Sequence, residues 1–375
     1  IVDFREFQVF EGATTYTCLL FLKKRVNPKV TVLSIRNKDG KPTDDIFNVP
    51  SRELAPQILT EKAWALADDA SKALIEKLNS EQAIRLLELP SEISRGSSTG
   101  ADEVFILTPA GGGNYKTRDG RVVQVEPEIL RTPLYATGFG RYQFRTESRE
   151  RILFPYDVDR HGYSLKGERD FKKEFPKAYK YLSGQREKLE SRKDFQQWYA
   201  FSAPRSLNVH DTAQLIVPLL ANHGLYTELP KNKSKYCLMA SGGFSISISK
   251  SDLSLRYILG VLNSTLLFWH LRQISNVFRG GWITCTKQYV GQLPIRHINF
   301  DDKADKKRHD AIVKLVEEML ELQKEHAEAE RALDDRRHAL KRRIDEIDRE
   351  IDRRVYDLYG LTTEEIAIVE NGRQA

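Results

Sequence analysis

Cysteine is scarce in this sequence, and long hydrophobic runs are missing. The three cysteines, Cys18, Cys237 and Cys285, form no Cys-x-x-Cys pair, which argues against a disulfide framework and a structural zinc site. The longest purely apolar run extends from Cys18 to Leu22, far short of the ~20 residues that a bilayer-spanning helix needs. These absences predict a protein without membrane spans in a reducing cytoplasm.

Recognisable catalytic motifs are also missing. There is no P-loop and no His-Glu-x-x-His motif, and Gly138-Phe139-Gly140 lacks the third glycine of a nucleotide-binding loop, so it is typical of a turn. Scattered histidines are interpreted as surface or core residues, and they are His161, His210, His223, His270 and His297. We therefore expect no metal site and assign no catalytic residue within the chain.

Positive charge is concentrated in the middle of the chain. The formal net charge of the 375 residues is +6, but residues 94–300 have 30 basic and 18 acidic side chains. Residues 1–93 have 13 and 14, and residues 303–354 have 15 of each. A basic segment between neutral ends is typical of a surface that neutralises phosphates. The alternative is a solvated basic face without a partner.

The patterning predicts an α+β protein with several parts. Residues 1–50 contain two strand-like runs, at 7–22 and 29–36, and residues 51–90 suit short amphipathic helices that form a connector. Residues 91–300 mix short strands, glycine-rich turns and helices at 171–196 and 253–274. Residues 301–375 have the apolar spacing of long helices, as an antiparallel pair or a coiled-coil stretch.

A loop at residues 94–100 combines two glycines with three hydroxyl side chains after a basic residue. Such a loop lets backbone N–H groups, Ser97, Ser98 and Thr99 approach a phosphate or a base edge, while Arg95 neutralises charge or reads guanine. The same spacing also suits the start of a plain β-hairpin.

Three further stretches mix basic, aromatic and hydroxyl residues, as groove reading requires. They lie at 141–145, 231–235 and 279–287. Their candidate DNA-facing residues are Arg141, Tyr142, Arg145, Lys231, Lys233, Lys235, Arg279, Trp282 and Lys287.

The order of several motifs resembles the C-terminal part of gamma-type N6-adenine DNA methyltransferases, especially the combined restriction–modification enzymes of type IIG. Residues 8–22 look like the last motif of the catalytic domain, and residues 93–107 look like the start of the target recognition domain. The remaining matching segments are 151–156, 175–182, 198–199, 259–264, 292–295 and 358–366.

This resemblance implies sequence-specific recognition of double-stranded DNA by residues 91–300. It also implies that a methyl group passes from S-adenosylmethionine to the N6 atom of an adenine flipped out of the duplex. Residues 1–50 would end the methyltransferase domain, as a remnant strand pair of its α/β sheet, and the aromatic ring of Phe10 would contact the flipped base. As an alternative, Phe10 is a core residue at a strand edge.

The catalytic motif of this family has no counterpart in the chain. The Asn-Pro-Pro-aromatic motif is absent, since the only Asn-Pro pair, Asn27-Pro28, precedes Lys29. The glycine-rich cofactor strand is absent too. We therefore expect a piece of a longer polypeptide whose methyltransferase domain lies upstream of Ile1, with the piece alone inactive and binding no cofactor. A nuclease domain further upstream is left open.

Two other functions also fit the sequence. One is a non-catalytic DNA-specificity subunit that pairs a recognition domain with spacer helices. The other is a helical scaffold whose residues 303–359 bind a partner, with an incidental basic domain. We favour an intramolecular role in which these helices pack against the recognition domain.

Overall fold

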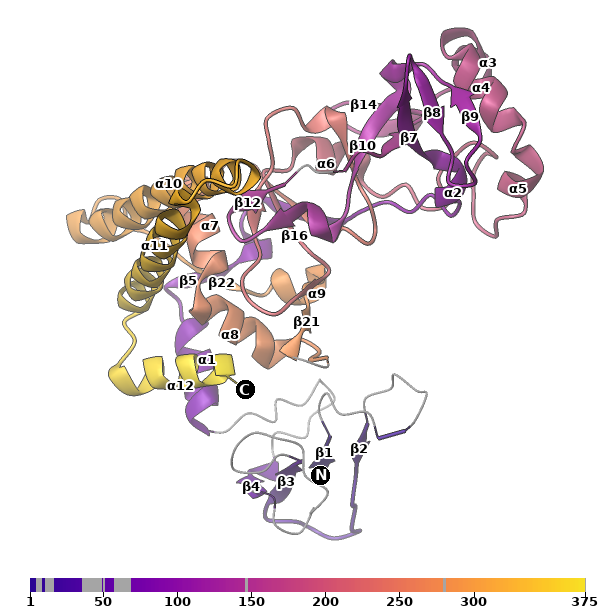
Figure 1. Ribbon diagram of the computed structural model, residues 1–375. Coiled ribbons are helices and arrows are strands. Elements are labelled where there is room, and N and C mark those ends of the chain that lie inside the picture. Colours follow the sequence, from indigo (N-terminus) through magenta and orange to yellow (C-terminus); the bar gives the residue numbers. More distant parts are fainter. Residues whose placement is uncertain are drawn as a thin grey trace.

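The computed structural model describes residues 1–4, 9–10, 17–35, 49, 51–56, 69–145, 148–278 and 281–374. Within these ranges the chain forms a small N-terminal sheet, a central body and a distal lobe (Figure 1). The predicted mixed α+β class is confirmed, with several small sheets and long helices near the C-terminus. None of the helices in these ranges is both long and apolar enough to cross a bilayer.

The N-terminal sheet has the strand order β2-β1-β3-β4. Its strands are β1 (Val2–Asp3), β2 (Cys18–Leu19), β3 (Val30–Ser34) and β4 (Ser51–Leu54). The strand predicted at 29–36 is confirmed as β3, but most of the run at 7–22 lies outside the described residues. The expected burial of this run is wrong at Phe21 and Leu22, which are 76% and 84% exposed because no described element covers them.

The central body is built on a four-stranded sheet of order β18-β16-β20-β6. Its strands are β6 (Ser91–Arg95), β16 (Leu215–Val217), β18 (Thr227–Glu228) and β20 (Phe244–Ile248). Alternating serine and apolar residues in β20 place Phe244 and Ile246 in the core. There they share one hydrophobic cluster with α7 (Leu255–Asn263) and α8 (Thr265–Ile274).

Serine hydroxyls begin both helices. The Ser254 Oγ accepts a hydrogen bond from the Arg256 N–H, and the Ser264 Oγ accepts one from the Leu267 N–H, so each satisfies a free donor of the first turn. Most residues of α7 and α8 are buried, as expected for helices that are apolar on most of their surface.

A long helical hairpin packs against α7, as predicted for residues 303–359. It consists of α10 (Lys303–Arg331) and α11 (Arg336–Leu358), and α12 (Thr363–Gln374) follows. The approach to α7 is close, because a Cβ on Gly260 would lie 2.8 Å from the Val316 Cγ2 and 2.9 Å from the Ile312 Cγ2. The hairpin therefore forms part of the core of the central body. This agrees with the intramolecular packing that we favoured from the sequence.

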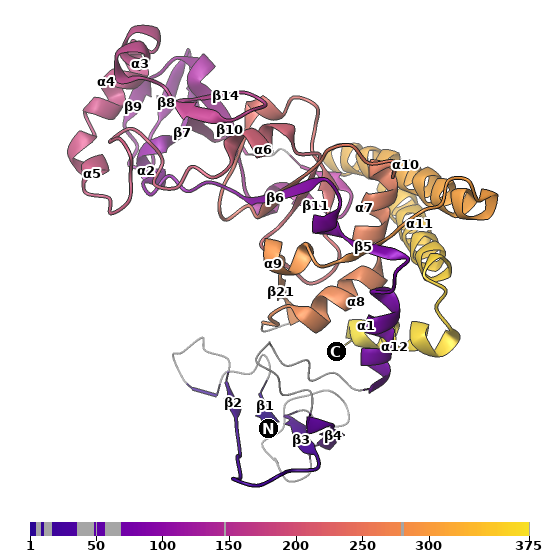
Figure 2. The same ribbon diagram turned by 180° about the vertical axis from the view of Figure 1, so that it is seen from behind.

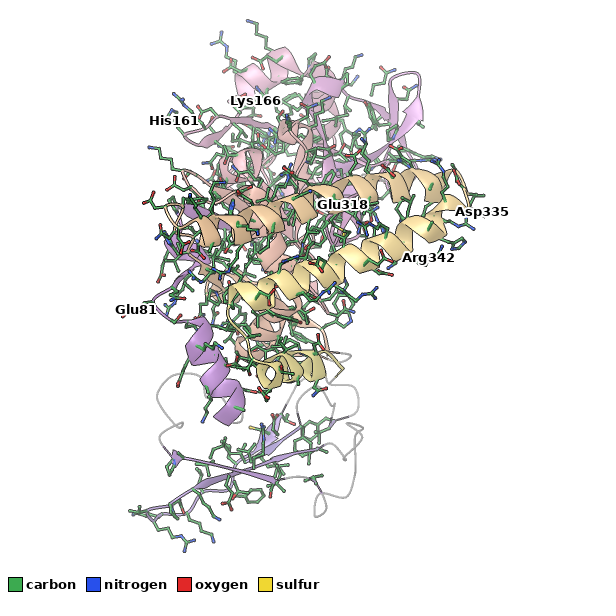
Figure 3. The ribbon with its side chains drawn as sticks, turned by 90° about the vertical axis from the view of Figure 1, so that its left-hand side faces the viewer. Glu81, His161, Lys166, Glu318, Asp335 and Arg342 are labelled. Atoms are coloured by element: carbon green, nitrogen blue, oxygen red, sulfur yellow. The ribbon has the colours of Figure 1, made fainter. Side chains whose placement is uncertain are left out.

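The outer face of the hairpin carries charges of both signs. Figure 3 looks onto this face, with Glu318 on α10, Arg342 on α11 and Asp335 at the turn. Arg343 Nη2 lies 2.7 Å from Glu318 Oε1, which joins the two helices across their exposed side.

The distal lobe contains a six-stranded sheet of order β19-β10-β13-β7-β8-β9. Its strands are β7 (Ile106–Gly111), β8 (Asn114–Lys116), β9 (Val122–Gln124), β10 (Leu130–Leu134), β13 (Arg151–Leu153) and β19 (Tyr236–Leu238). Its helices are α2 (Asp102–Phe105), α3 (Glu168–Glu174), α4 (Pro176–Ser183) and α5 (Arg186–Glu190). A separate aromatic-rich core that includes Phe105, Tyr156, Phe171 and Phe201 holds the lobe together.

The remaining elements are short. The helices are α1 (Asp69–Leu78), α6 (Leu207–Thr212), α9 (Lys287–Val290), η2 (Leu86–Glu88), η3 (Pro127–Ile129), η4 (Ala136–Gly138) and η5 (Lys233–Lys235). The strands are β5 (Ala83–Arg85), β11 (Phe139–Gly140), β12 (Gln143–Phe144), β14 (Tyr156–Val158), β15 (Tyr163–Leu165), β17 (Leu220–Ala221), β21 (Ile283–Thr284) and β22 (Pro294–Arg296). Of the predicted helical connector at 51–90, the described residues form one helix, α1, together with β4, β5 and η2.

Backbone pairing joins the central body to the distal lobe at a waist formed by residues 96–99, 132–134, 203–205 and 238–240. The N–H of Ser97 donates to the Leu238 carbonyl at 2.8 Å, and the N–H of Ser98 donates to the Ala203 carbonyl at 3.0 Å. Strand β10 continues through the waist, pairing with β13 at its start and with β19 at its end. The two lobes are thus joined by several paired strands.

Candidate nucleic-acid interface

The positive charge is concentrated more narrowly than the totals suggest. Between Leu229 and Phe300 the sequence has nine Lys or Arg residues and one acidic residue, Asp252. These residues include β20, β21, α7, α8 and α9, all of them in the central body. A stretch so poor in carboxylates leaves its surface positive, which suits a polyanionic partner.

Strands β17 and β21 form a two-stranded ribbon within this region. Leu220 pairs with Thr284, and Ala221 pairs with Ile283, whose side chains are both buried. Side chains alternate between the two faces of a ribbon, so Leu220, Trp282 and Thr284 share the opposite face. Leu220 and Trp282 are each 39% exposed there.

Two basic residues lie at the ends of neighbouring elements. Lys287 is the first residue of α9, and Arg95 is the last residue of β6, which α9 contacts. Both side chains are exposed, and no carboxylate of the described residues forms an ion pair with either of them. We call Arg95, Leu220, Trp282, Thr284 and Lys287 the ribbon surface.

The ribbon surface is on the opposite side of the central body from the helical hairpin. In Figures 1 and 2, β21 and α9 lie together on one side, and α10 and α11 lie on the other. The β21–α9 part of the positive stretch and the zwitterionic hairpin therefore present different faces to solvent.

The loop at 94–100 is used mainly to build the waist. The Ser97 Oγ accepts a hydrogen bond from the Arg205 N–H at 3.0 Å, and the Thr99 Oγ1 accepts one from the Ala101 N–H at 3.0 Å. Ser97 and Thr99 are buried, and Ser98 is half-buried. Gly96 is needed for close packing, because a Cβ there would lie 2.1 Å from the Met239 carbonyl oxygen. Arg95 is the basic residue of this loop, and its side chain is exposed.

Arg141 and Tyr142 are also turned inward. The Arg141 Nη2 lies 2.6 Å from Asp348 Oδ1 on α11, and its Nη1 donates to the carbonyls of Gly224 and Asn263. Tyr142 is buried in the core of the central body. Arg145 is exposed, and its Nε donates to the Gln143 side chain.

The other candidates fall in different places. Lys231 is exposed just before η5, which contacts α6 and β10 near the waist. Lys233 and Lys235 are the first and last residues of η5, and Lys235 is exposed. Phe10 is 58% exposed in the N-terminal region, and Arg279 lies outside the described residues.

Buried groups in the described part show no nucleophile ready for chemistry. Burial raises the pKa of the Cys237 and Cys285 thiols to about 12, so both stay protonated at neutral pH. Gly138 ends η4, and Phe139 and Gly140 form β11, so the expected turn at these residues is replaced by a strand and no helix follows it. No group of three His, Cys, Asp or Glu residues in the described ranges is placed to hold a metal.

Of the residues on the ribbon surface, sequence reasoning named Arg95, Trp282 and Lys287 as candidates but not Leu220. The residue pattern gave no sign of Leu220, because its exposure depends on pairing with β21 more than sixty residues later. The near absence of acidic residues after Leu229 was the signal that could have located this region.

Two comparisons with known proteins concern the same part of the chain. Residues 163–295 match the TaqI-like C-terminal specificity domain, and they include β17, β21 and α9. The chain is 22% identical over 329 residues to the type II restriction enzyme and methyltransferase RM.Eco57I of Escherichia coli. That alignment covers 83% of this chain and 33% of the relative, so the chain spans about a third of the relative's length. The resemblance read from the motif order is thereby confirmed: the chain contains a TaqI-like specificity domain and is distantly related to a restriction–modification methyltransferase.

Proposed function

We propose that the chain is the DNA-recognition part of an N6-adenine methyltransferase of a cytoplasmic restriction–modification system. The observation that carries this proposal is the overlap of the specificity-domain match with the carboxylate-poor stretch, which contains Trp282, Thr284 and Lys287 of the ribbon surface. Cations beside hydroxyl and aromatic groups are the side chains that hold phosphates and contact bases.

Within this proposal, Lys287 holds a phosphate and Arg95 reads a base or a phosphate. Lys231, Lys235 and Arg145 are candidates for additional phosphate contacts. Ser97, Thr99, Arg141 and Tyr142 act indirectly, by keeping the waist and the central body in shape.

Methyl transfer is assigned to a methyltransferase domain that precedes this chain in the same polypeptide. The described residues do not fit S-adenosylmethionine, because their two Gly-x-Gly sequences, at 111–113 and 138–140, both lead into strands and neither leads into a helix. We therefore derive no chemical step from this chain, and Phe10 keeps its proposed contact with the flipped adenine as part of the longer protein.

A scaffold function is less consistent with the structure. The apolar sides of α10 and α11 are already used, since Ile312, Val316 and Ile351 are buried in the core of the central body. The outward charges of the hairpin are paired with one another at several positions, such as Lys341 with Asp345 and Arg343 with Glu318.

The test is a titration of the chain with a labelled mixed-sequence DNA duplex at several salt concentrations. We expect the association constant to fall steeply with salt, because each phosphate contact releases a counterion. Lys287→Ala should weaken binding and reduce the slope of log K against log salt by about 1. Lys314→Ala removes the same charge from an exposed position of α10 and should change neither quantity. Absent or salt-independent binding by the unmodified chain would contradict the proposal.

A further inference from the structure

Leu220 and Trp282 give the ribbon surface an apolar patch that phosphate binding does not explain. Leu220 lies in β17 and Trp282 directly precedes β21, and each side chain is 39% exposed. An exposed tryptophan beside an exposed leucine, surrounded by polar groups, is typical of a contact surface. Phosphates offer an indole ring no favourable partner, whereas the faces of nucleic-acid bases do.

The two strands that carry the patch are anchored in the core. Ala221 and Ile283 anchor the opposite face of the ribbon in the core. The Cys285 N–H donates to the Leu219 carbonyl at 2.9 Å, and the Ser275 Oγ donates to the Thr284 carbonyl at 2.7 Å. Trp282 directly precedes this anchored strand, and its carbonyl accepts a hydrogen bond from the Phe278 N–H at 2.6 Å. A backbone that is ordered before binding lowers the entropy lost when a partner binds.

The charge around the patch is complementary to a polyanion. From Leu253 to Phe300 the sequence contains no Asp or Glu, so this segment adds no negative charge of its own beside the ribbon. Lys287 follows the ribbon directly, as the first residue of α9. A cation next to an apolar ring favours DNA over an apolar protein surface.

We propose that Trp282, supported by Leu220, enters the duplex as an apolar wedge and opens a base step where the ribbon surface contacts DNA. This inference rests on the proposed DNA-recognition function and adds that recognition deforms the duplex. Base faces are hidden in a stacked helix, so the ring gains a stacking partner only where a step opens. Apolar wedges that unstack and kink DNA are an established way to gain contact area. The cost of opening depends on the sequence, so the wedge also contributes to specificity.

The test compares two labelled duplexes of the same sequence, one fully paired and one with a single central mismatch. A mismatched step costs less to open. We expect the unmodified chain to bind the mismatched duplex several-fold more tightly. Trp282→Ala should bring the two affinities together and weaken binding by about 10- to 100-fold, the effect of losing one base–aromatic stack. Its salt slope should stay unchanged, because no charge is removed.

Two further variants distinguish loss of the wedge from a general loss of folding. Trp282→Phe keeps a ring and should retain the preference for the mismatched duplex, while abolishing most of the DNA-induced quenching of tryptophan fluorescence. Trp198 and Trp269 are buried and should contribute little to that quenching, and the fourth tryptophan is removed by Trp64→Phe in every protein compared. Leu333→Ala removes an exposed apolar side chain at the hairpin turn and serves as the matched control.

The outcomes are distinguishable. If the unmodified chain binds neither duplex, the proposed function itself fails. If it binds both equally, with the same affinity and salt dependence as Trp282→Ala, DNA recognition stands and the wedge is overturned. Quenching that is undiminished in Trp282→Phe would also overturn it.

Discussion

Two histidines are buried as neutral imidazoles in the centre of the molecule. The His210 Nδ1 lies 2.6 Å from the Ser245 Oγ, and the His270 Nε2 lies 3.3 Å from the Asn79 Nδ2. Burial lowers the pKa of each imidazole from 6.5 to about 4, and the nearby Arg131 guanidinium adds to the effect at His210. Neither ring can accept a proton without a large cost in solvation.

We predict that these histidines make folding pH-dependent below neutrality. Their folded-state pKa is depressed, so the unfolded chain binds more protons as the pH falls below 6.5. The stability they contribute is complete above pH 6.5 and is lost towards pH 4, with about 3 kcal/mol for each residue. Urea unfolding at pH 7 and pH 5 should show this loss. His270→Gln should reduce it, whereas His161→Gln, at an exposed position, should leave it unchanged. Identical pH dependence in all three proteins would refute the prediction.

The residue pattern alone could locate the loop at 94–100 but not its partners. Glycines and hydroxyls can serve a phosphate or another backbone equally well. The loop donates backbone hydrogen bonds to the carbonyls of Leu238, Ala203 and Gly243, all more than one hundred residues away in sequence. These contacts form only in the tertiary structure, so the periodicity of the sequence cannot predict them.

At the scale of elements, helix α11 is attached to the central body by two acidic residues one turn apart. Asp348 pairs with Arg141 beside the β11–β12 hairpin. Asp352 accepts hydrogen bonds from the Thr265 N–H at 2.7 Å and the Thr265 hydroxyl at 2.6 Å, which fixes the start of α8. Burial raises the pKa of Asp352, and these hydrogen bonds oppose that shift.

We predict that the Arg141–Asp348 pair contributes to stability and not to DNA contact. Asp348→Ala leaves a largely buried guanidinium with only carbonyl partners, and should reduce the free energy of unfolding by about 2 kcal/mol. Combined with Arg141→Met, the loss should be smaller than the sum of the single changes, because the second change removes the unpaired charge. A double-mutant cycle in urea measures this coupling. If Arg141→Met weakened DNA binding without loss of stability, Arg141 would be a DNA contact after all.

Sequence periodicity was sufficient for α10, α11, α7 and α8, since each repeats apolar residues at helical spacing. It failed for Arg141 and Tyr142, where alternating basic and aromatic residues predicted DNA-facing side chains. Arg141 pairs with Asp348 of α11, and this acidic partner is 207 residues away in the sequence.

At the scale of the whole molecule, residues on both sides of position 300 build one core. The cluster contains Leu215 and Ile246 of the sheet, Tyr257 of α7, and Ile312 and Ile351 of the hairpin. Helix α12 also closes the structure onto the connector, because the Lys77 Nζ of α1 lies 2.6 Å from both the Gly360 carbonyl oxygen and Glu365 Oε2.

We predict that a chain ending at Phe300 does not fold cooperatively. Removing α10 to α12 would expose the apolar surface that α7 and α8 bury against them, which costs about 25 cal/mol for each Å². Thermal unfolding followed by near-ultraviolet circular dichroism should show a transition for the full chain and none for the shortened one. A shortened chain that melts like the full chain would show that the helices are a separate appendage.

The several strands of the waist have a consequence for engineering. Because the polypeptide passes between the two lobes repeatedly, at residues 96–99, 132–134 and 203–205, neither lobe is a contiguous cassette. Transplanting one lobe from a homologue with a different DNA site would require several matched splice points, each preserving backbone pairing with its neighbours. Changes of target sequence should therefore be sought by substituting exposed side chains on an intact scaffold.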